Sequence, residues 1–343
     1  MGWYSAVGRP LFFALPPETA HRLAGSMLGL PLPWSRIGHA VEDPRSRTAV
    51  AGIALRNPIG LAAGFDKTCS HLDALGELGF GYVVGGTITR TPRTGNAKPR
   101  IVRYPRRGSM ANAMGLPNPG AETAASNLIR RPSSNVPRLV SVADEALEDA
   151  LATFALLEPH ADGIELNASC PNVSWGRDRD NEAHLRELVG AMRARSATPI
   201  FVKLPPFTTG VERDVVIALA TIALEAGASG LTCSNTRLVR DTRLSVGIGG
   251  LSGVALWERT ASILADMRAA TGGSVPINAC GGVSTWQDVL TCLEAGASTV
   301  QIYSALIYQG PAVVGTLARG LAKALQDRRT AVGDFAGSAE PAA

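Results

Sequence analysis

The sequence predicts an α/β protein built on a (β/α)8 TIM barrel with a small N-terminal helical extension. From about residue 46 onward, eight short apolar runs alternate with helix-length segments. Each run is nearly continuous in apolar residues, as expected for parallel strands that are buried on both faces. An open, doubly wound sheet is the alternative, but a count of eight strands favours a closed barrel.

The expected strands follow one another at regular intervals. They are residues 57–64, 81–87, 138–143, 163–167, 199–204, 230–235, 275–282 and 298–304. Amphipathic segments between them, such as NEAHLRELVGAMRARS and DVVIALATIALEAGAS, are expected to be helices. The sequence EAGAS occurs twice, each time directly before an expected strand, which indicates a repeated structural unit.

Residues 1–45 form a segment of different composition. The stretch WYSAVGRPLFFALPPETAHRLAGSMLGLPLPW is apolar and aromatic, and Pro16-Pro17 divides it into two helix-length pieces. Either these helices cap the barrel, or they lie in a membrane surface. In the second case the inserted side chains are Trp3, Tyr4, Phe12, Phe13, Leu28, Leu30 and Trp34. The barrel is expected over residues 46–328, and residues 329–343 are expected to be a disordered tail.

Composition excludes several classes of protein. The formal net charge is +4, which is too small to indicate a nucleic-acid partner. The five cysteines are odd in number and lack CxxC spacing, so we expect reduced thiols in the cytoplasm, with neither a disulfide framework nor a zinc site. We expect neither a signal peptide nor a spanning helix, because the N-terminus lacks the features of the first and no apolar run reaches about 18 residues.

Polar residues follow most of the expected strands. In a barrel of this kind the active site lies at the C-terminal ends of the strands. The residues found there are amides, lysines, hydroxyls, glycines and one thiol: Lys67, Thr87, Ser141, Asn167, Cys170, Asn172, Lys203, Asn235, Thr236, Gly281 and Gly282. This set suits a planar anionic ligand rich in hydrogen-bonding groups, and it offers no cluster suited to a metal.

Three glycine-rich segments point to a phosphate group. ACGGVST (279–285) and YSALIYQG (303–310) follow the last two expected strands, where barrels often bind phosphate through backbone N–H groups, and GIGGLSG (247–253) is expected to be a third loop. A phosphate held there leaves the rest of a flavin mononucleotide across the barrel mouth. Lys203 then offsets negative charge on the reduced flavin ring; alternatively it is an ion-paired barrel lysine.

Several motifs in order resemble the dihydroorotate dehydrogenase family. They cover the chain from about Arg9 to Gly310 and include NPIGLAAGFDK, GTITRTPRTGNAKPRIVR, NAMGLPNPG, NASCPN, VKLPP, SNT, GGLSG, GGV and VQIYSALIYQGP. The resemblance implies an oxidoreductase that uses FMN to oxidise dihydroorotate to orotate in pyrimidine biosynthesis.

The resemblance also assigns roles to individual residues. Those implied to hold the flavin are Ala62, Ala63, Gly64, Lys67, Thr87, Ser141, Asn167, Lys203, Ser234, Ser252, Gly253, Gly281, Gly282, Tyr303 and Ser304. Those implied to bind the substrate are Lys67, Asn112, Met114, Gly115, Leu116, Asn167, Asn172, Asn235 and Thr236. Asparagine suits orotate because it both donates and accepts hydrogen bonds.

Cys170 is the implied catalytic base. It stands where the family places the group that removes a proton from the substrate, and a neighbouring lysine or amide network can stabilise its thiolate. The alternative is a buried cysteine that acts only as a small apolar residue.

The sequence mixes features of two branches of the family. Cys170 and RLVSVAD (138–144) resemble the soluble branch, which reduces fumarate or NAD. The N-terminal LPPETAHRLA resembles the membrane branch, whose quinone tunnel implies roles for His21, Arg103 and Tyr303. We give the N-terminal segment more weight and expect a quinone acceptor and a peripheral position on the cytoplasmic side of the cell membrane. The oligomeric state stays open.

Other functions remain possible at this point. Leu116 stands where an aromatic residue is common, and Pro117-Asn118-Pro119 stiffens the same loop. If these departures change the substrate, the chain is a flavin-dependent paralogue that acts on another dihydropyrimidine or cyclic amide. The same reaction with fumarate or NAD as acceptor, and a non-catalytic barrel that keeps FMN as a structural ligand, are further alternatives.

Overall fold

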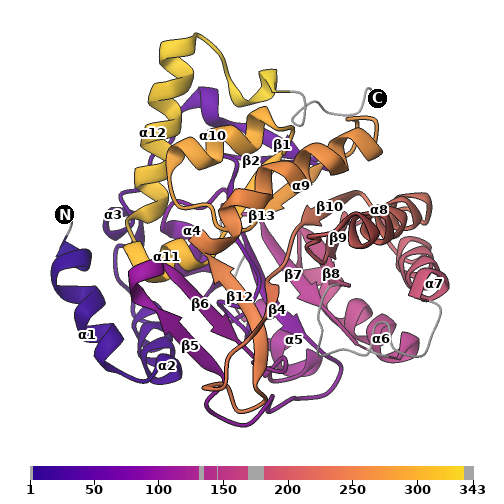
Figure 1. Ribbon diagram of the computed structural model, residues 1–343, viewed down its shortest axis with the longest axis horizontal. Helices are drawn as coiled ribbons and strands as arrows, with labels where there is room; N and C mark the ends of the chain where they lie inside the picture. Colours follow the sequence, from indigo (N-terminus) through magenta and orange to yellow (C-terminus); the bar gives the residue numbers. More distant parts are fainter. Residues whose placement is uncertain (1–2, 131–134, 145, 169–180, 336–343) are drawn as a thin grey trace.

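A closed barrel of eight parallel strands forms the centre of the molecule in the computed structural model (Figure 1). The structure describes residues 3–130, 135–144, 146–168 and 181–335. The barrel strands are β3 (Ile59–Leu61), β4 (Tyr82–Ile88), β7 (Arg138–Val142), β8 (Gly163–Asn167), β9 (Ile200–Leu204), β10 (Gly230–Cys233), β13 (Ile277–Cys280) and β14 (Thr299–Ile302). Each lies within or closely overlaps an expected strand, so the predicted fold class is confirmed.

Helices surround the barrel and cover its outer face (Figure 1). They are α4 (Leu72–Glu77), α5 (Ala121–Ile129), α6 (Leu147–Leu157), α7 (Asn181–Arg193), α8 (Gly210–Glu225), α9 (Trp257–Ala270), α10 (Trp286–Glu294), α11 (Ser304–Gln309) and α12 (Val313–Arg328). Local sequence fixes where some begin: Thr209 with Glu212, and Thr285 with Asp288, form capping boxes that start α8 and α10.

Two small antiparallel sheets were not predicted. The hairpin of β1 (Thr48–Val50) and β2 (Ile53–Leu55) places Val50 and Leu55 against Leu139 and Phe201, near the N-terminal ends of the barrel strands. The second sheet joins β5 (Ile101–Tyr104), β6 (Ser109–Asn112), β11 (Arg237–Arg240) and β12 (Ile248–Gly253) in the order β11-β12-β6-β5. The segment 247–253, expected to be a loop, is therefore largely strand β12.

The N-terminal segment consists of short helices beside the second sheet (Figure 1). They are η1 (Tyr4–Gly8), α1 (Arg9–Ala14), α2 (Pro17–Leu28) and α3 (Trp34–Ile37), and the Pro16-Pro17 break separates α1 from α2 as predicted. Leu28 and Trp34, expected to insert into a membrane, are instead buried in the main core.

The C-terminal part of the chain is folded beyond α12. The segment expected to be a disordered tail from residue 329 includes the 3-10 helix η6 (Val332–Asp334). Val332 is completely buried in the main core, so the folded part extends at least to residue 335.

Candidate functional site

A cavity of about 730 Å³ lies over the C-terminal ends of the barrel strands. Its volume falls in the range of small-molecule and cofactor sites. Its walls come from the barrel strands, the second sheet and the N-terminal helices. The predicted site residues that line it are Ala62, Ala63, Gly64, Lys67, Thr87, Asn112, Met114, Gly115, Leu116, Asn167, Lys203, Asn235, Thr236, Ser252, Gly253, Gly281, Gly282, Tyr303 and Ser304, together with His21 and Arg103.

Three asparagines of the cavity are held by their neighbours. Asn167 Nδ2 donates a hydrogen bond to Thr87 Oγ1 at 3.2 Å. The side chain of Asn112 donates to the Gly250 carbonyl at 3.4 Å, and Asn235 Oδ1 accepts from the Thr236 backbone N–H at 2.8 Å. These contacts fix the amides on three sides of one cavity, where they can meet the edges of a planar ligand.

Two predicted residues lie outside the cavity lining. Ser141 is completely buried, and its hydroxyl lies 2.9 Å from that of Thr87. Ser234 borders a small depression next to Phe207 and Arg259. Ser141 therefore orients Thr87 from behind. Cys170 and Asn172 lie outside the residues that the structure describes.

Lys67 is one of the cationic residues that line the cavity. Its ammonium group donates to the Gly64 carbonyl. Burial lowers the pKa of Lys67 to about 8, although the nearby carboxylates of Asp66 and Glu18 oppose this shift. Lys67 is thus cationic at neutral pH but titrates within the range in which an enzyme can be assayed.

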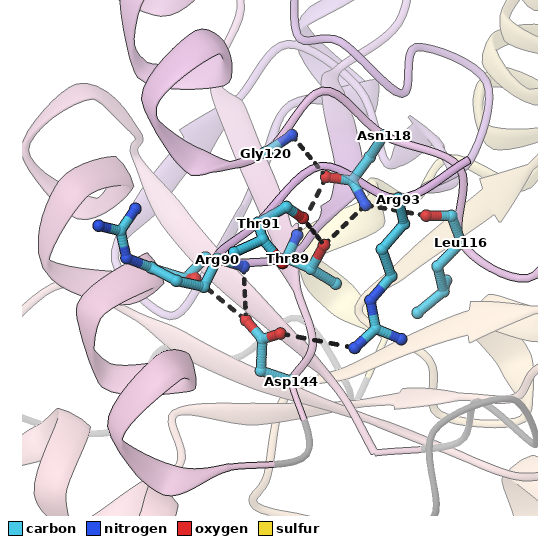
Figure 2. Close-up of polar contacts among 9 residues, drawn as sticks. Thr89, Arg90, Thr91, Arg93, Leu116, Asn118, Gly120 and Asp144 are labelled. Atoms are coloured by element: carbon cyan, nitrogen blue, oxygen red, sulfur yellow. Dashed lines mark hydrogen bonds and ion pairs between the residues drawn. The ribbon is translucent and has the colours of Figure 1, made fainter. Parts of the chain in front are cut away.

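The loop that carries Leu116 is fixed by Asn118 (Figure 2). Asn118 Nδ2 donates to the Leu116 carbonyl at 2.8 Å and to Thr89 Oγ1 at 2.9 Å. Asn118 Oδ1 accepts from the backbone N–H groups of Gly120 at 2.9 Å and Thr89 at 3.2 Å. All hydrogen-bonding positions of this buried amide are used. The chain positions Leu116 at the cavity through this asparagine rather than through the flanking prolines alone.

Asp144 anchors the neighbouring segment of the same loop system (Figure 2). Its Oδ2 accepts from the Arg90 backbone N–H at 2.8 Å, and its Oδ1 lies 3.9 Å from the Arg93 guanidinium. Partial burial raises the pKa of Asp144, although the bonds from Arg90 and Thr153 oppose the shift.

Two glycines allow the backbone to form the far end of the cavity. Gly253 and Gly282 have φ values of +92° and +76°. A Cβ atom at these positions would lie 2.4 Å from the Gly108 carbonyl oxygen and 2.5 Å from the Trp257 nitrogen. No side chain fits at either position. Close by, the hydroxyls of Ser252 and Ser304 lie 3.3 Å apart.

Two polar residues at the cavity floor were not singled out from the sequence, namely Gln301 and Cys280. Glu165, directly below them, was also missed; it is completely buried and lies 3.6 Å from the Lys203 ammonium group. The signal was present, because GIELN and VQIYS each place a polar residue in the middle of an apolar strand.

The N-terminal helices close the opposite end of the cavity. The His21 ring packs edge-on against Phe65 at 5.2 Å, and Phe65 packs in the same way against Tyr303 at 5.9 Å. Arg103 donates to the carbonyls of Phe12, Phe13 and Leu15, and its guanidinium lies 4.6 Å from the centre of the Phe13 ring.

Burial and a nearby positive charge keep the His21 imidazole neutral. Burial, together with the positive charge of Lys67, lowers the pKa of His21 to about 4. Burial raises the pKa of Tyr303 to about 12. Tyr4, Phe12 and Phe13, three of the side chains expected to insert into a membrane, are partly buried and line this cavity.

Comparison with known proteins agrees with this architecture. Residues 45–325 match the family model described as dihydroorotate dehydrogenase. The chain is 35% identical to a dihydroorotate dehydrogenase (quinone) of Novosphingobium aromaticivorans, over 96% of this chain and 98% of that protein. It is 39% identical to one from Erythrobacter litoralis, over 93% and 94%.

A solved structure is similar over nearly the whole length. The dihydroorotate dehydrogenase of Eimeria tenella in complex with ferulenol superposes with a TM-score of 0.81 at 30% identity, and the match covers 94% of this chain and 95% of that one. The family match and the shared barrel confirm the predicted resemblance, and this chain belongs to the dihydroorotate dehydrogenase family.

Proposed function

We propose that this protein is a dihydroorotate dehydrogenase that oxidises dihydroorotate to orotate and passes the electrons to a quinone. The observation that carries the proposal is one cavity that joins three kinds of wall. Amides and Lys67 form one part, close-packed glycines another, and aromatic side chains of the N-terminal helices the third. The relatives named as quinone-dependent enzymes extend over this N-terminal segment as well as the barrel.

The residues present fit FMN as the flavin. Gly253, Gly281 and Gly282 line the cavity without side chains, so the backbone there can approach a phosphate closely. The Lys203 ammonium group, held on the cavity floor, suits a ring that gains negative charge on reduction. When bound, the flavin supplies the two-electron acceptor that links the substrate to the quinone. Ala62, Ala63, Gly64 and Thr87 would flank its ring, and Ser252, Gly281, Tyr303 and Ser304 would hold its remaining parts.

The substrate end performs binding and proton removal. Asn112, Asn167, Asn172 and Asn235 would match the amide groups of the pyrimidine ring, with Thr236, Met114 and Gly115 beside them. Lys67 balances the carboxylate charge while it is protonated. Cys170 Sγ, as thiolate, takes the proton from the ring carbon next to the one that loses hydride.

The N-terminal end supplies a path for an apolar acceptor. His21, Arg103 and Tyr303 would line this path, and a neutral His21 favours an uncharged ligand. Residues 1–45 would form a membrane-associating unit and residues 46–328 the catalytic barrel. Exposed apolar side chains on this unit, including Trp3, Leu11, Leu23 and Leu30, support a peripheral position at a membrane surface. The side that we propose is the cytoplasmic one. Every helix in the described ranges is too short or too polar to cross a bilayer.

An anaerobic titration tests the proposal. The purified flavoprotein is titrated with dihydroorotate while flavin absorbance is followed, and a short-chain quinone is then added. We expect bleaching followed by recovery. Bleaching reversed by fumarate but not by quinone would overturn the acceptor, and a flavin that stays oxidised would overturn the substrate.

A further inference from the structure

The interior of the barrel contains a polar layer between its apolar base and the cavity. Barrel interiors are usually filled by branched apolar side chains. Here Glu165, Thr232, Asn278, Thr299 and Gln301 occupy the interior, and all are at most 1% exposed. So many buried polar groups need an explanation beyond packing, because each costs free energy unless it is bonded.

A chain of hydrogen bonds converges on Glu165. Its Oε2 accepts from Thr232 Oγ1 and from Gln301 Nε2, both at 3.0 Å. Thr232 accepts in turn from Asn278 at 3.4 Å, and Asn278 accepts from Thr299 at 2.6 Å. The Tyr82 hydroxyl, 2.7 Å from that of Thr299, ends the chain. These bonds hold the carboxylate in one orientation.

The other oxygen of Glu165 faces Lys203. Glu165 Oε1 has no hydrogen-bond partner among the described residues, and it lies 3.6 Å from Lys203 Nζ. That distance makes an ion pair rather than a hydrogen bond. Lys203 lines the cavity, whereas Glu165 lies one layer below it. A buried ammonium group therefore has a fixed carboxylate beneath it and the cavity above it.

We propose that Glu165 is a positioning residue that keeps Lys203 cationic and aimed at the flavin site, and thereby sets the redox potential of the flavin. Charge beside a flavin ring is one of the means by which a protein tunes the cofactor. A buried lysine without a partner readily loses its proton. This inference rests on the proposed function for the presence of FMN, but the ion pair itself belongs to the chain alone.

The titratable groups around Lys203 agree with this role. Burial lowers the pKa of Lys203, but the Glu165 carboxylate and, to a lesser degree, the Cys280 thiol outweigh it and raise the pKa above its ordinary value. Burial raises the pKa of Cys280, although Lys203 opposes the shift. Burial also raises the pKa of Tyr82. Glu165 is thus the neighbour whose charge decides the state of Lys203.

The first test is the midpoint potential of bound FMN as a function of pH. In E165Q the shape and the bond from Thr232 are kept while the charge is lost. We expect its potential to be more positive than that of the wild type at about pH 6, because the charge of Lys203 is no longer balanced. Without the carboxylate, burial lowers the pKa of Lys203, so the E165Q plot should show a break, where Lys203 loses its proton, that the wild-type plot lacks over the same pH range.

Y82F is the matched control. It breaks the far end of the same hydrogen-bond chain without removing a charge, so its potential should follow the wild type at every pH. If E165Q binds FMN and its plot coincides with that of the wild type, Glu165 does not set the potential and the proposal is wrong. A shift of equal size in Y82F would show that the effect comes from packing, which also contradicts it.

A second measurement needs no flavin. The thermal unfolding of the apo-protein is compared for E165Q, K203Q and the double variant. We expect the double variant to be more stable than the sum of the single losses predicts, because each single variant leaves one uncompensated buried charge. Additive losses would overturn the ion pair. If the wild type itself fails to bind FMN, the proposed function fails, and this cycle still decides the pairing of Glu165 with Lys203.

Discussion

The floor of the cavity differs in construction from its N-terminal cover, which consists of the helices η1, α1, α2 and α3. At and below the floor, buried polar side chains of different barrel strands bond to one another across the interior, as Glu165 of β8 does with Thr232 of β10 and Gln301 of β14. The cover is attached by the burial of Leu28 and Trp34 in the main core and by a few long polar side chains. Arg100 donates to Glu18 at 2.9 and 3.1 Å, Arg103 reaches the carbonyls at the end of α1, and the Tyr4 hydroxyl donates to the Ile307 carbonyl at 2.8 Å.

This difference indicates a division of work within one cavity. Hydride and proton removal need groups held in place to within a fraction of an ångström, which rigid strands provide. Entry of a bulky apolar acceptor needs an apolar wall that can move slightly relative to the barrel. We therefore expect changes near the barrel to slow flavin reduction, and changes in the cover to affect reoxidation and membrane binding.

The largest effect should come from C170A. Loss of a general base typically slows a reaction by about 100- to 10,000-fold, so flavin reduction by dihydroorotate should slow by that factor while reoxidation by quinone is unchanged. Anaerobic stopped-flow absorbance measures both steps. C292A removes a buried thiol of α10 that is not part of the cavity lining, and serves as the control. Near-normal reduction in C170A would exclude Cys170 as the base.

Vesicle binding should respond next most strongly, and only to the cover. Leu11 is 65% exposed and Leu23 is 46% exposed. Full burial of a leucine contributes about 1.5–3 kcal/mol, so L11S/L23S should weaken binding to lipid vesicles at least about tenfold. Co-sedimentation measures the bound fraction. V211S/V215S changes two exposed valines of α8 and should bind vesicles as the wild type does. Equal losses of binding in both variants would mean that the N-terminal cover is not the membrane-binding surface.

The pH dependence of substrate capture should report Lys67. Because its pKa is lowered to about 8, Lys67 loses its positive charge as the pH rises through that value. Below about pH 8 the charge is present, and above it kcat/KM for dihydroorotate should fall by up to about tenfold per pH unit. In K67R the guanidinium stays protonated, so the fall should disappear even if the overall rate is lower. A fall that persists unchanged in K67R would assign it to another group.

The smallest effect should come from loosening the cover. E18Q removes the carboxylate that pairs with Arg100 and Lys98 and should destabilise the protein by about 1 kcal/mol. Partial burial raises the pKa of Glu18, but the bonds from Arg100 and Lys98 outweigh it and lower the pKa below 4.5. The contribution is therefore present above about pH 4.5 and is lost as the pH falls further.

Thermal unfolding at neutral and at acidic pH measures the effect of E18Q. We expect the difference from the wild type to shrink at low pH, together with a several-fold rise in the KM for quinone and unchanged flavin reduction. A slower reduction step in E18Q would show that cover and barrel are not separable.

The barrel was predictable from the sequence because its strands are buried on both faces and give continuous apolar runs. The second sheet was not, since β11 reads RLVR and β12 is rich in glycine, patterns typical of loops. Pro16 and Pro17 marked the helix break because proline acts locally. Glu165 was missed because its role depends on side chains from three other strands, which no local pattern brings together. The hydrogen bonds of Asn118 were not predicted either, since Thr89, one of its partners, comes from a separate loop.

The hairpin of β1 and β2 has a consequence for hydrogen exchange with solvent. Val50 and Leu55 pack against Leu139 and Phe201 and cover the base of the barrel below the polar layer. Protons of the Glu165 network must therefore exchange with water mainly through the cavity above Lys203. A ligand seated there should slow deuterium uptake in β8 and β13, although both strands lie beneath it. The rate of deuterium uptake in the barrel interior would then report whether the cavity is occupied.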